Sequence, residues 1–238
     1  YTSIKCTAAA GTGSNLRWQV CIGSGGCGIS SPSAVTSYES PTIDAAKTAT
    51  KNQKLDLTPI KFSTKGGTRL TIVGKNFGAA EANVAVRYNS AGVVSTATDC
   101  YVGPADGTDE TIVCEMPAGA GTNFYLKAVC QGQESAATPP TYSYVQPIII
   151  SVTNPAGVLE LDTKGGDKVT ITGKNFGPTG TAVTATVGGK AAVCIQDTVA
   201  PQTTMVCTAP AHVGENLGWQ VSCGGQLSAL SSAAIATS

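Results

Sequence analysis

The amino-acid sequence predicts an all-β protein built of tandem β-sandwiches, with half of a further sandwich at the N-terminus. The run "TKGGTRLTIVGKNFG" at 64–78 recurs as "TKGGDKVTITGKNFG" at 163–177. Apolar and polar residues alternate within these runs, which is typical of strands with one buried face. Glycines and prolines interrupt the chain roughly every 8–12 residues, the usual spacing of turns in a β-sandwich.

A second repeated block places the domain boundaries. In "ETIVCEMPAGAGTNFYLKAVC" (110–130) and "TTMVCTAPAHVGENLGWQVSC" (203–223), a cysteine precedes an asparagine by nine positions. The opening stretch "TSIKCTAAAGTGSNLRWQVC" (2–21) has the same spacing, but no "GKNFG" run precedes it. Repeats of this period are whole small domains rather than solenoid units. The sequence therefore predicts a partial repeat, second half only, at 1–40 and complete domains at 41–146 and 147–238.

The alternation also selects candidate core residues. The phenylalanine of each "KNFG" is expected to enter the core, while its asparagine and glycine tolerate the left-handed turn at the end of a strand. Leucine stands at 126 where the other repeats have tryptophan, which favours a structural over a ligand-stacking role for the tryptophans. We expect the core to include Trp18, Leu70, Ile72, Phe77, Leu126, Val169, Ile171, Phe176 and Trp219.

Composition excludes several classes of function. Charged residues make up 13% of the chain and the formal net charge is zero, so no basic field is available to hold nucleic acid. No apolar run approaches the roughly 20 residues that a membrane-spanning helix needs. We therefore expect no nucleic-acid partner and no membrane span in this segment.

Catalytic and metal-binding motifs are also missing from the sequence. It contains no GxSxG, HExxH, P-loop or EF-hand pattern. His212 is the one histidine and is interpreted as a loop residue. The acidic stretch "ADGTDE" at 105–110 is interpreted as a solvated turn, with weak calcium binding as the alternative. We predict no enzymatic activity, no catalytic or metal site, and no cofactor.

The two complete repeats together resemble the IPT/TIG domain. The resemblance is carried by "GGxxxTIxGxNFG", then a cysteine, then "C-x-x-P-x-x-x-G-x-N", in that order, and it covers nearly the whole chain. It implies compact immunoglobulin-like sandwiches of about seven strands. It also implies one of several settings: extracellular receptors, cell-surface repeat proteins, carbohydrate-active enzymes or transcription factors. Scattered basic residues argue against the last of these.

The nine cysteines indicate an oxidising, extracellular or cell-surface location. Two candidate pairs, Cys100–Cys114 and Cys194–Cys207, occupy the same place in the two repeats, and a third candidate pair, Cys21–Cys27, flanks a short hairpin. The cysteines that remain, interpreted either as intermolecular or interdomain partners or as buried thiols, are Cys6, Cys130 and Cys223.

The half repeat suggests assembly. Half a sandwich leaves strand edges and an apolar face open. A neighbouring copy that supplies the missing strands would make a head-to-tail polymer. The alternatives are upstream sequence that completes the repeat, or packing of residues 1–40 on the first complete domain.

We therefore predict an extracellular structural protein, a subunit of a fibre or surface appendage whose partners are copies of itself. The alternatives are a ligand-binding ectodomain module of a receptor or adhesin and an accessory domain of a secreted carbohydrate-active enzyme. Ser and Thr cluster near prolines in "ISSPSAVTS", "SAATPPTYS" and "VAPQTT". These clusters fit O-linked glycans or, equally, an ordinary polar strand surface.

Overall fold

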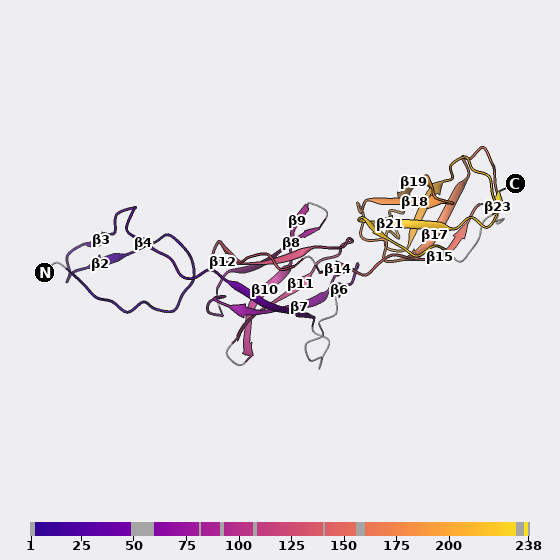
Figure 1. Ribbon diagram of the computed structural model, residues 1–238. Coiled ribbons are helices and arrows are strands. Elements are labelled where there is room, and N and C mark those ends of the chain that lie inside the picture. The colour runs from indigo at the N-terminus through magenta and orange to yellow at the C-terminus, as the bar shows by residue number, and fades with distance from the viewer. Residues whose placement is uncertain are drawn as a thin grey trace.

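The computed structural model describes residues 3–48, 60–80, 82–90, 93–106, 109–139, 141–155, 160–231 and 236–237. Strands and their connections make up these residues, and no helix occurs among them, so the predicted all-β class is confirmed. Accordingly, nothing in the described ranges is a helix that could cross a membrane. Three parts follow one another end to end, with the two termini at opposite ends of an elongated molecule (Figure 1).

The N-terminal part consists of two small antiparallel strand pairs. One pair joins β1 to β4, and the other is the β2–β3 hairpin, in which Cys21 lies opposite Cys27. The residues of these strands are almost all exposed, and the chain between them runs as open loops (Figure 1). The strands are β1 (Leu16–Arg17), β2 (Gln19–Cys21), β3 (Cys27–Ile29) and β4 (Val35–Thr36).

The first complete domain is a sandwich of two four-stranded sheets. One sheet has the order β10-β11-β7-β5, the other has the order β13-β12-β8-β9, and a short parallel pair, β14-β6, closes one end. The strands are β5 (Thr42–Thr48), β6 (Lys61–Phe62), β7 (Thr68–Lys75), β8 (Val84–Ser90), β9 (Val93–Thr96), β10 (Thr98–Asp106), β11 (Asp109–Met116), β12 (Tyr125–Cys130), β13 (Gln133–Glu134) and β14 (Ser143–Tyr144).

The second complete domain repeats this plan with one continuous sheet of order β15-β17-β20-β19-β18-β21-β22, and a short parallel pair, β16-β23. Here β19 pairs with β18 through its first residues and with β20 through its last. In the first domain the equivalent strand is interrupted at Ala97, between β9 and β10, so the two sheets separate. The strands are β15 (Ile148–Thr153), β16 (Glu160–Leu161), β17 (Lys168–Lys174), β18 (Val183–Val187), β19 (Lys190–Gln196), β20 (Thr204–Thr208), β21 (Trp219–Cys223), β22 (Gln226–Leu227) and β23 (Ala236–Thr237).

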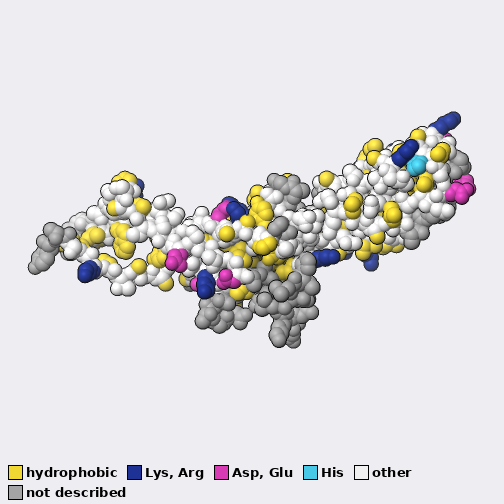
Figure 2. Space-filling view, in the orientation of Figure 1, with side chains coloured by type: hydrophobic (Ala, Val, Ile, Leu, Met, Phe, Trp, Pro, Cys, Tyr) yellow, Lys and Arg dark blue, Asp and Glu magenta, His cyan; other side chains and the backbone are white. Residues whose placement is uncertain are grey.

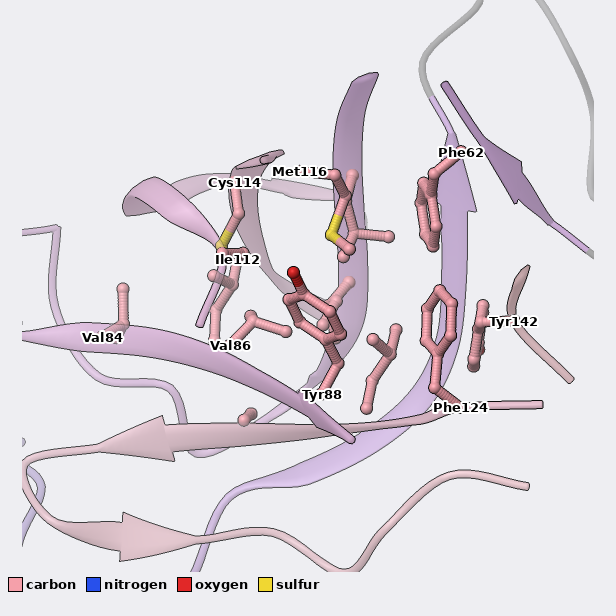
Figure 3. Close-up of a cluster of buried hydrophobic side chains, with 14 of the residues drawn as sticks. Phe62, Val84, Val86, Tyr88, Ile112, Cys114, Met116, Phe124 and Tyr142 are labelled. Atoms are coloured by element: carbon pink, nitrogen blue, oxygen red, sulfur yellow. The ribbon is translucent and has the colours of Figure 1, made fainter. Parts of the chain in front are cut away.

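Each complete domain has its own apolar core. In the first domain, Phe62 stacks on Phe124 with ring centroids 5.8 Å apart, and Met116 and Ile112 of β11 belong to the same core (Figure 3). Tyr144 closes this core from β14, and its hydroxyl donates to the carbonyl of Pro117 at 3.0 Å. The expected core residues of the two complete domains are buried: Leu70, Ile72, Phe77, Leu126, Val169, Ile171, Phe176 and Trp219.

The expectation that Trp18 is a core residue is wrong. Its side chain is 42% exposed, and its neighbours on the same face, Leu16 and Val20, are 38% and 41% exposed. Figure 2 shows hydrophobic side chains on the surface of this N-terminal part. The strands that cover the equivalent positions in the complete domains belong to the first half of a repeat. Residues 3–40 contain no such strands, so an inward-facing position remains open to solvent.

Candidate functional site

The described residues do not assemble a metal-binding cluster. Nowhere in that part of the chain do three or more His, Cys, Asp or Glu side chains gather to hold a metal ion. His212 lies in the loop between β20 and β21, where Nδ1 accepts the N–H of Val213 at 2.8 Å and Nε2 contacts the carbonyl of Gly188 at 3.3 Å. The ring therefore organises its own loop. Residues 107 and 108 of the acidic turn lie outside the described residues.

The three candidate cysteine pairs are disulfides in the structure: Cys21–Cys27, Cys100–Cys114 and Cys194–Cys207. In each complete domain the bond joins neighbouring strands of one sheet, β10 to β11 and β19 to β20. The cross-link restricts the unfolded chain and so favours the folded domain, by roughly 3 kcal/mol for loops of this size.

The remaining three cysteines differ in environment. Cys6 is exposed and free, whereas Cys130 and Cys223 are free and buried in the two cores. Burial raises the pKa of the Cys130 thiol to about 11, with a further upward contribution from Glu110, and burial raises the pKa of Cys223 to about 12. Both buried residues occupy inward-facing strand positions, so neither sulfur lies on a surface that another chain or domain could reach. Cys6 alone is placed for an external bond.

The candidate functional site is the set of joints between successive parts of the chain. At the first joint, the side-chain amide of Gln133 hydrogen-bonds the half repeat through both of its ends. Nε2 donates to the carbonyl of Tyr38 at 3.0 Å, and Oε1 accepts the N–H of Gly13 at 2.9 Å. Asn76 Nδ2 donates to the carbonyl of Ser40 at 3.1 Å, just before the chain enters β5. Two amide side chains of the following domain therefore hold the linker.

The second joint uses the same positions. Gln226 Nε2 donates to the carbonyl of Tyr144 at 3.1 Å, and Asn175 Nδ2 donates to the carbonyl of Gln146 at 3.1 Å. In the repeat alignment Gln226 corresponds to Gln133, and each of these two stands three positions after a buried cysteine. The linker acceptors are likewise equivalent, tyrosine in both cases followed two residues later by the second carbonyl. The joint is thus one arrangement used twice.

This geometry gives the repeated "GKNFG" a role at the joint. Its first glycine lets the edge strand approach, since a Cβ at Gly74 would lie 1.9 Å from the carbonyl oxygen of Thr42. Its asparagine has positive φ, 63° at Asn76 and 64° at Asn175, and carries the amide that binds the linker. Its phenylalanine is fully buried in both copies. The one short motif therefore couples a core anchor to an interdomain hydrogen bond.

The last glycine of the motif faces the preceding part of the chain. A Cβ at Gly78, where φ is 92°, would lie 2.6 Å from Thr12 Cγ2. A Cβ at Gly177, where φ is 88°, would lie 3.0 Å from Ala120 Cβ, and Thr12 and Ala120 are equivalent in the repeat alignment. A side chain at these positions would meet both backbone strain and the neighbouring domain.

Sequence reasoning found half of this site. It assigned the asparagine and glycine of "KNFG" to a turn but not to the linker, and it did not single out Gln133 or Gln226. A signal was present, because both glutamines occupy the third position after Cys130 and Cys223 in otherwise different turns, "QGQ" and "GGQ".

Comparisons with known proteins identify the family of the two complete domains. The IPT/TIG domain family matches residues 55–144 and 147–236. Plexin-A4 from Homo sapiens is 29% identical over 163 residues, which is 66% of this chain and 8% of Plexin-A4. The chain therefore spans less than a tenth of the length of that curated relative.

Among solved structures, the titin Ig tandem domains A164-A165 align with 84% of this chain and 96% of theirs. The TM-score is 0.30 and the sequence identity 12%, so this likeness carries no argument.

Proposed function

Because the chain belongs to the IPT/TIG domain family, we propose that it is a non-catalytic structural segment of an extracellular or cell-surface protein. Its complete domains form a rod, and its N-terminal half repeat joins rods head-to-tail into a fibre or surface appendage. Three disulfides fit an oxidising location, where such bonds persist. The repeated joint fits a rod, because the same contacts orient each part on the one before it.

The single observation that carries the assembly proposal is the open face of the half repeat. Trp18 is 42% exposed, whereas Leu126 and Trp219, at the same position in the complete repeats, are fully buried. Exposed apolar faces and unpaired strands attract further strands. The natural cover is a first half-repeat of the "GGxxxTIxGxNFG" kind, and a neighbouring copy that supplies it makes a contact that does not close into a ring.

Cys6 supports the same proposal. It occupies the repeat position of Cys114 and Cys207, each of which is bonded to a cysteine on the preceding strand of its own domain. Within the described residues Cys6 is free and exposed. An incoming half-repeat with an unpaired cysteine at the position equivalent to Cys100 or Cys194 would bring a thiol to Cys6, and a two-electron oxidant of the oxidising location would join the two thiols, with loss of two protons, as a disulfide between subunits.

Negative-stain electron microscopy of the native material tests the proposal. We expect regular fibres, and peptide mapping without reduction should find Cys6 bonded to another subunit. The variant Trp18→Asp should abolish fibres, while the matched control Val193→Asp, at a site that is already 75% exposed on the last domain, should not. Separate short rods from the wild-type protein would contradict assembly through the half repeat.

A second candidate function is a ligand-binding ectodomain module of a cell-surface receptor, favoured by the similarity to a segment of Plexin-A4. Glycan and cell-surface protein arrays test it, and specific saturable binding by separate rods would favour it over the fibre. We also propose O-linked glycans on the Ser- and Thr-rich stretches. The intact mass of the native protein before and after chemical removal of O-glycans tests that proposal.

A further inference from the structure

The second joint contains an additional pair of hydrogen bonds between the complete domains. Gln202 Nε2 donates to the carbonyl of Thr64 at 2.8 Å, and Thr64 Oγ1 donates to Gln202 Oε1 at 2.8 Å. One carboxamide therefore binds both the backbone and the side chain of one residue. The two partners are 138 positions apart in the sequence, so the pair fixes domain against domain rather than domain against linker.

Thr64 is buried by this contact. It is 1% exposed, whereas Thr163, at the same repeat position in the last domain, is only partly buried. The backbone around both threonines is otherwise alike, since each carbonyl accepts an N–H from the equivalent loop, from Gly119 in one case and His212 in the other, at 3.1 Å. A buried hydroxyl requires a partner, and the next domain supplies it.

Hydrogen bonds within the last domain fix the loop that carries Gln202, independently of its contact with Thr64. Its own carbonyl accepts the N–H of Phe176, the core residue of the "GKNFG" motif, at 3.0 Å. Earlier in the same loop, Asp197 Oδ1 accepts the N–H of Val199 at 2.9 Å and of Ala200 at 2.7 Å. These bonds restrict the loop, so little freedom is lost when the side chain binds.

The first joint has no counterpart of Thr64 among the described residues. Thr64 belongs to the first half of a repeat, and residues 3–40 correspond to the second half. The hydrogen bonds given above for the first joint run to Gly13, Tyr38 and Ser40 of the half repeat, and all of them come from Gln133 or Asn76. That joint is held at the linker and one adjacent turn.

We propose that Gln202 and Thr64 are positioning residues that fix the angle between the two complete domains, while the first joint acts as the compliant one. This inference rests on the proposed rod. The stiff joint keeps the complete domains aligned, and the compliant joint lets the open face of the half repeat reorient towards an incoming strand. An incoming strand that completes the half repeat would place a residue at the position equivalent to Thr64. The first complete domain could then bind the half repeat at a second point, in addition to the linker.

Residual dipolar couplings measured by NMR in a weakly aligning medium test this directly. In the wild-type protein, the alignment tensors of residues 60–146 and 147–231 should have equal magnitude, and that of residues 3–40 should be smaller. Gln202→Ala should make the two large tensors unequal, and Thr64→Val should do the same. The control Gln220→Ala removes a bond to Ser228 within one domain and should leave the tensors equal.

Chemical-shift spectra of each variant verify that the domains remain folded. Unequal tensors for the complete domains in the wild type, or equal tensors in both Gln202→Ala and Thr64→Val, would overturn the inference. The fibre proposal is judged separately by microscopy, since a flexible second joint does not prevent the half repeat from joining subunits.

Discussion

Trp18 and Trp219 occupy equivalent positions in two repeats. Replacing each by alanine therefore compares the same strand where other strands pack over it, at Trp219, with the strand where they do not, at Trp18. Trp219 is fully buried and Trp18 is 42% exposed. If the half repeat lacks its covering strands, the two substitutions should differ sharply in their effect on stability. If residues 1–40 are completed within the chain, the two effects should be similar.

The expected magnitudes follow from burial. A tryptophan buries roughly 150–250 Å², worth about 4–6 kcal/mol at about 25 cal/mol per Å², and measured Trp→Ala losses are about 3–5 kcal/mol. The indole N–H of Trp219 has no hydrogen-bond partner in the described structure, a buried cost of about 1–3 kcal/mol that alanine removes. We therefore expect a loss near the lower end, about 3 kcal/mol, for Trp219→Ala.

For Trp18→Ala we expect about 2 kcal/mol, because little more than half of the measured loss of about 3–5 kcal/mol is about 2–3 kcal/mol and the part of that loss due to a cavity is absent here. Little more than half of the side chain is buried, and water fills the vacated space, so no cavity cost is added.

Native-state hydrogen exchange resolved by mass spectrometry measures these losses region by region. Peptides from β17 and β21 measure the loss of stability caused by Trp219→Ala, and peptides from β2 and β3 measure the loss caused by Trp18→Ala. Peptides from β7 and β11 are the internal control, because neither residue belongs to that core. Equal losses of about 3 kcal/mol at both sites would refute the reasoning that the N-terminal face is open.

The remaining predictions concern thiols and core anchors. In the folded protein as separate, unassembled subunits, a thiol reagent should modify Cys6 alone, and after unfolding it should also modify Cys130 and Cys223, as counted by mass spectrometry. Because burial raises the pKa of these two thiols to about 11 and about 12, above an unfolded value of roughly 8.5, their contribution to stability is complete below that value. The urea midpoint should therefore fall as the pH rises from about 9 towards 11. Tyr144→Phe removes a buried 3.0 Å hydrogen bond to a backbone carbonyl and should cost about 1 kcal/mol in urea unfolding. Phe176→Ala should cost about 3–5 kcal/mol in the same assay, and no change would show that the motif does not anchor the core.

Much of the fold follows from sequence pattern alone. Alternation at Leu70 and Ile72, and at Val169 and Ile171, is enough to select buried positions, since an inward position in a closed sandwich has one environment. The same rule failed at Trp18. Burial depends on what covers the strand as well as on the strand itself, and alternation within one strand carries no information about the strands that cover it. The alternation of apolar and polar residues predicts to which side of a strand a side chain points. Whether that side chain is buried depends on the strands that pack against it.

The joints were harder to predict for a different reason. Asn76 and Asn175 donate to carbonyls 36 and 29 residues earlier, and the residues that bear these carbonyls, Ser40 and Gln146, share no side-chain chemistry. A bond to a backbone acceptor leaves no trace in the acceptor's identity. The donor can be recognised by its recurrence, but its target cannot be found until the chain is folded.

Because the donors are recurring side chains and the acceptors are backbone carbonyls, the repeats can combine in different numbers. Both Gln133 and Gln226 bind the carbonyl of a tyrosine, and both asparagines bind a linker carbonyl, so the following domain holds the preceding one almost entirely through its backbone. Linker side chains are therefore free to vary, as they do between "YESP" and "YVQP". A domain that carries the glutamine and the asparagine can be joined to any predecessor with this linker path. The number of domains in such a rod can then change without redesign of the joint, whereas the angle at each joint depends on pairs such as Gln202 and Thr64, which are specific to one junction.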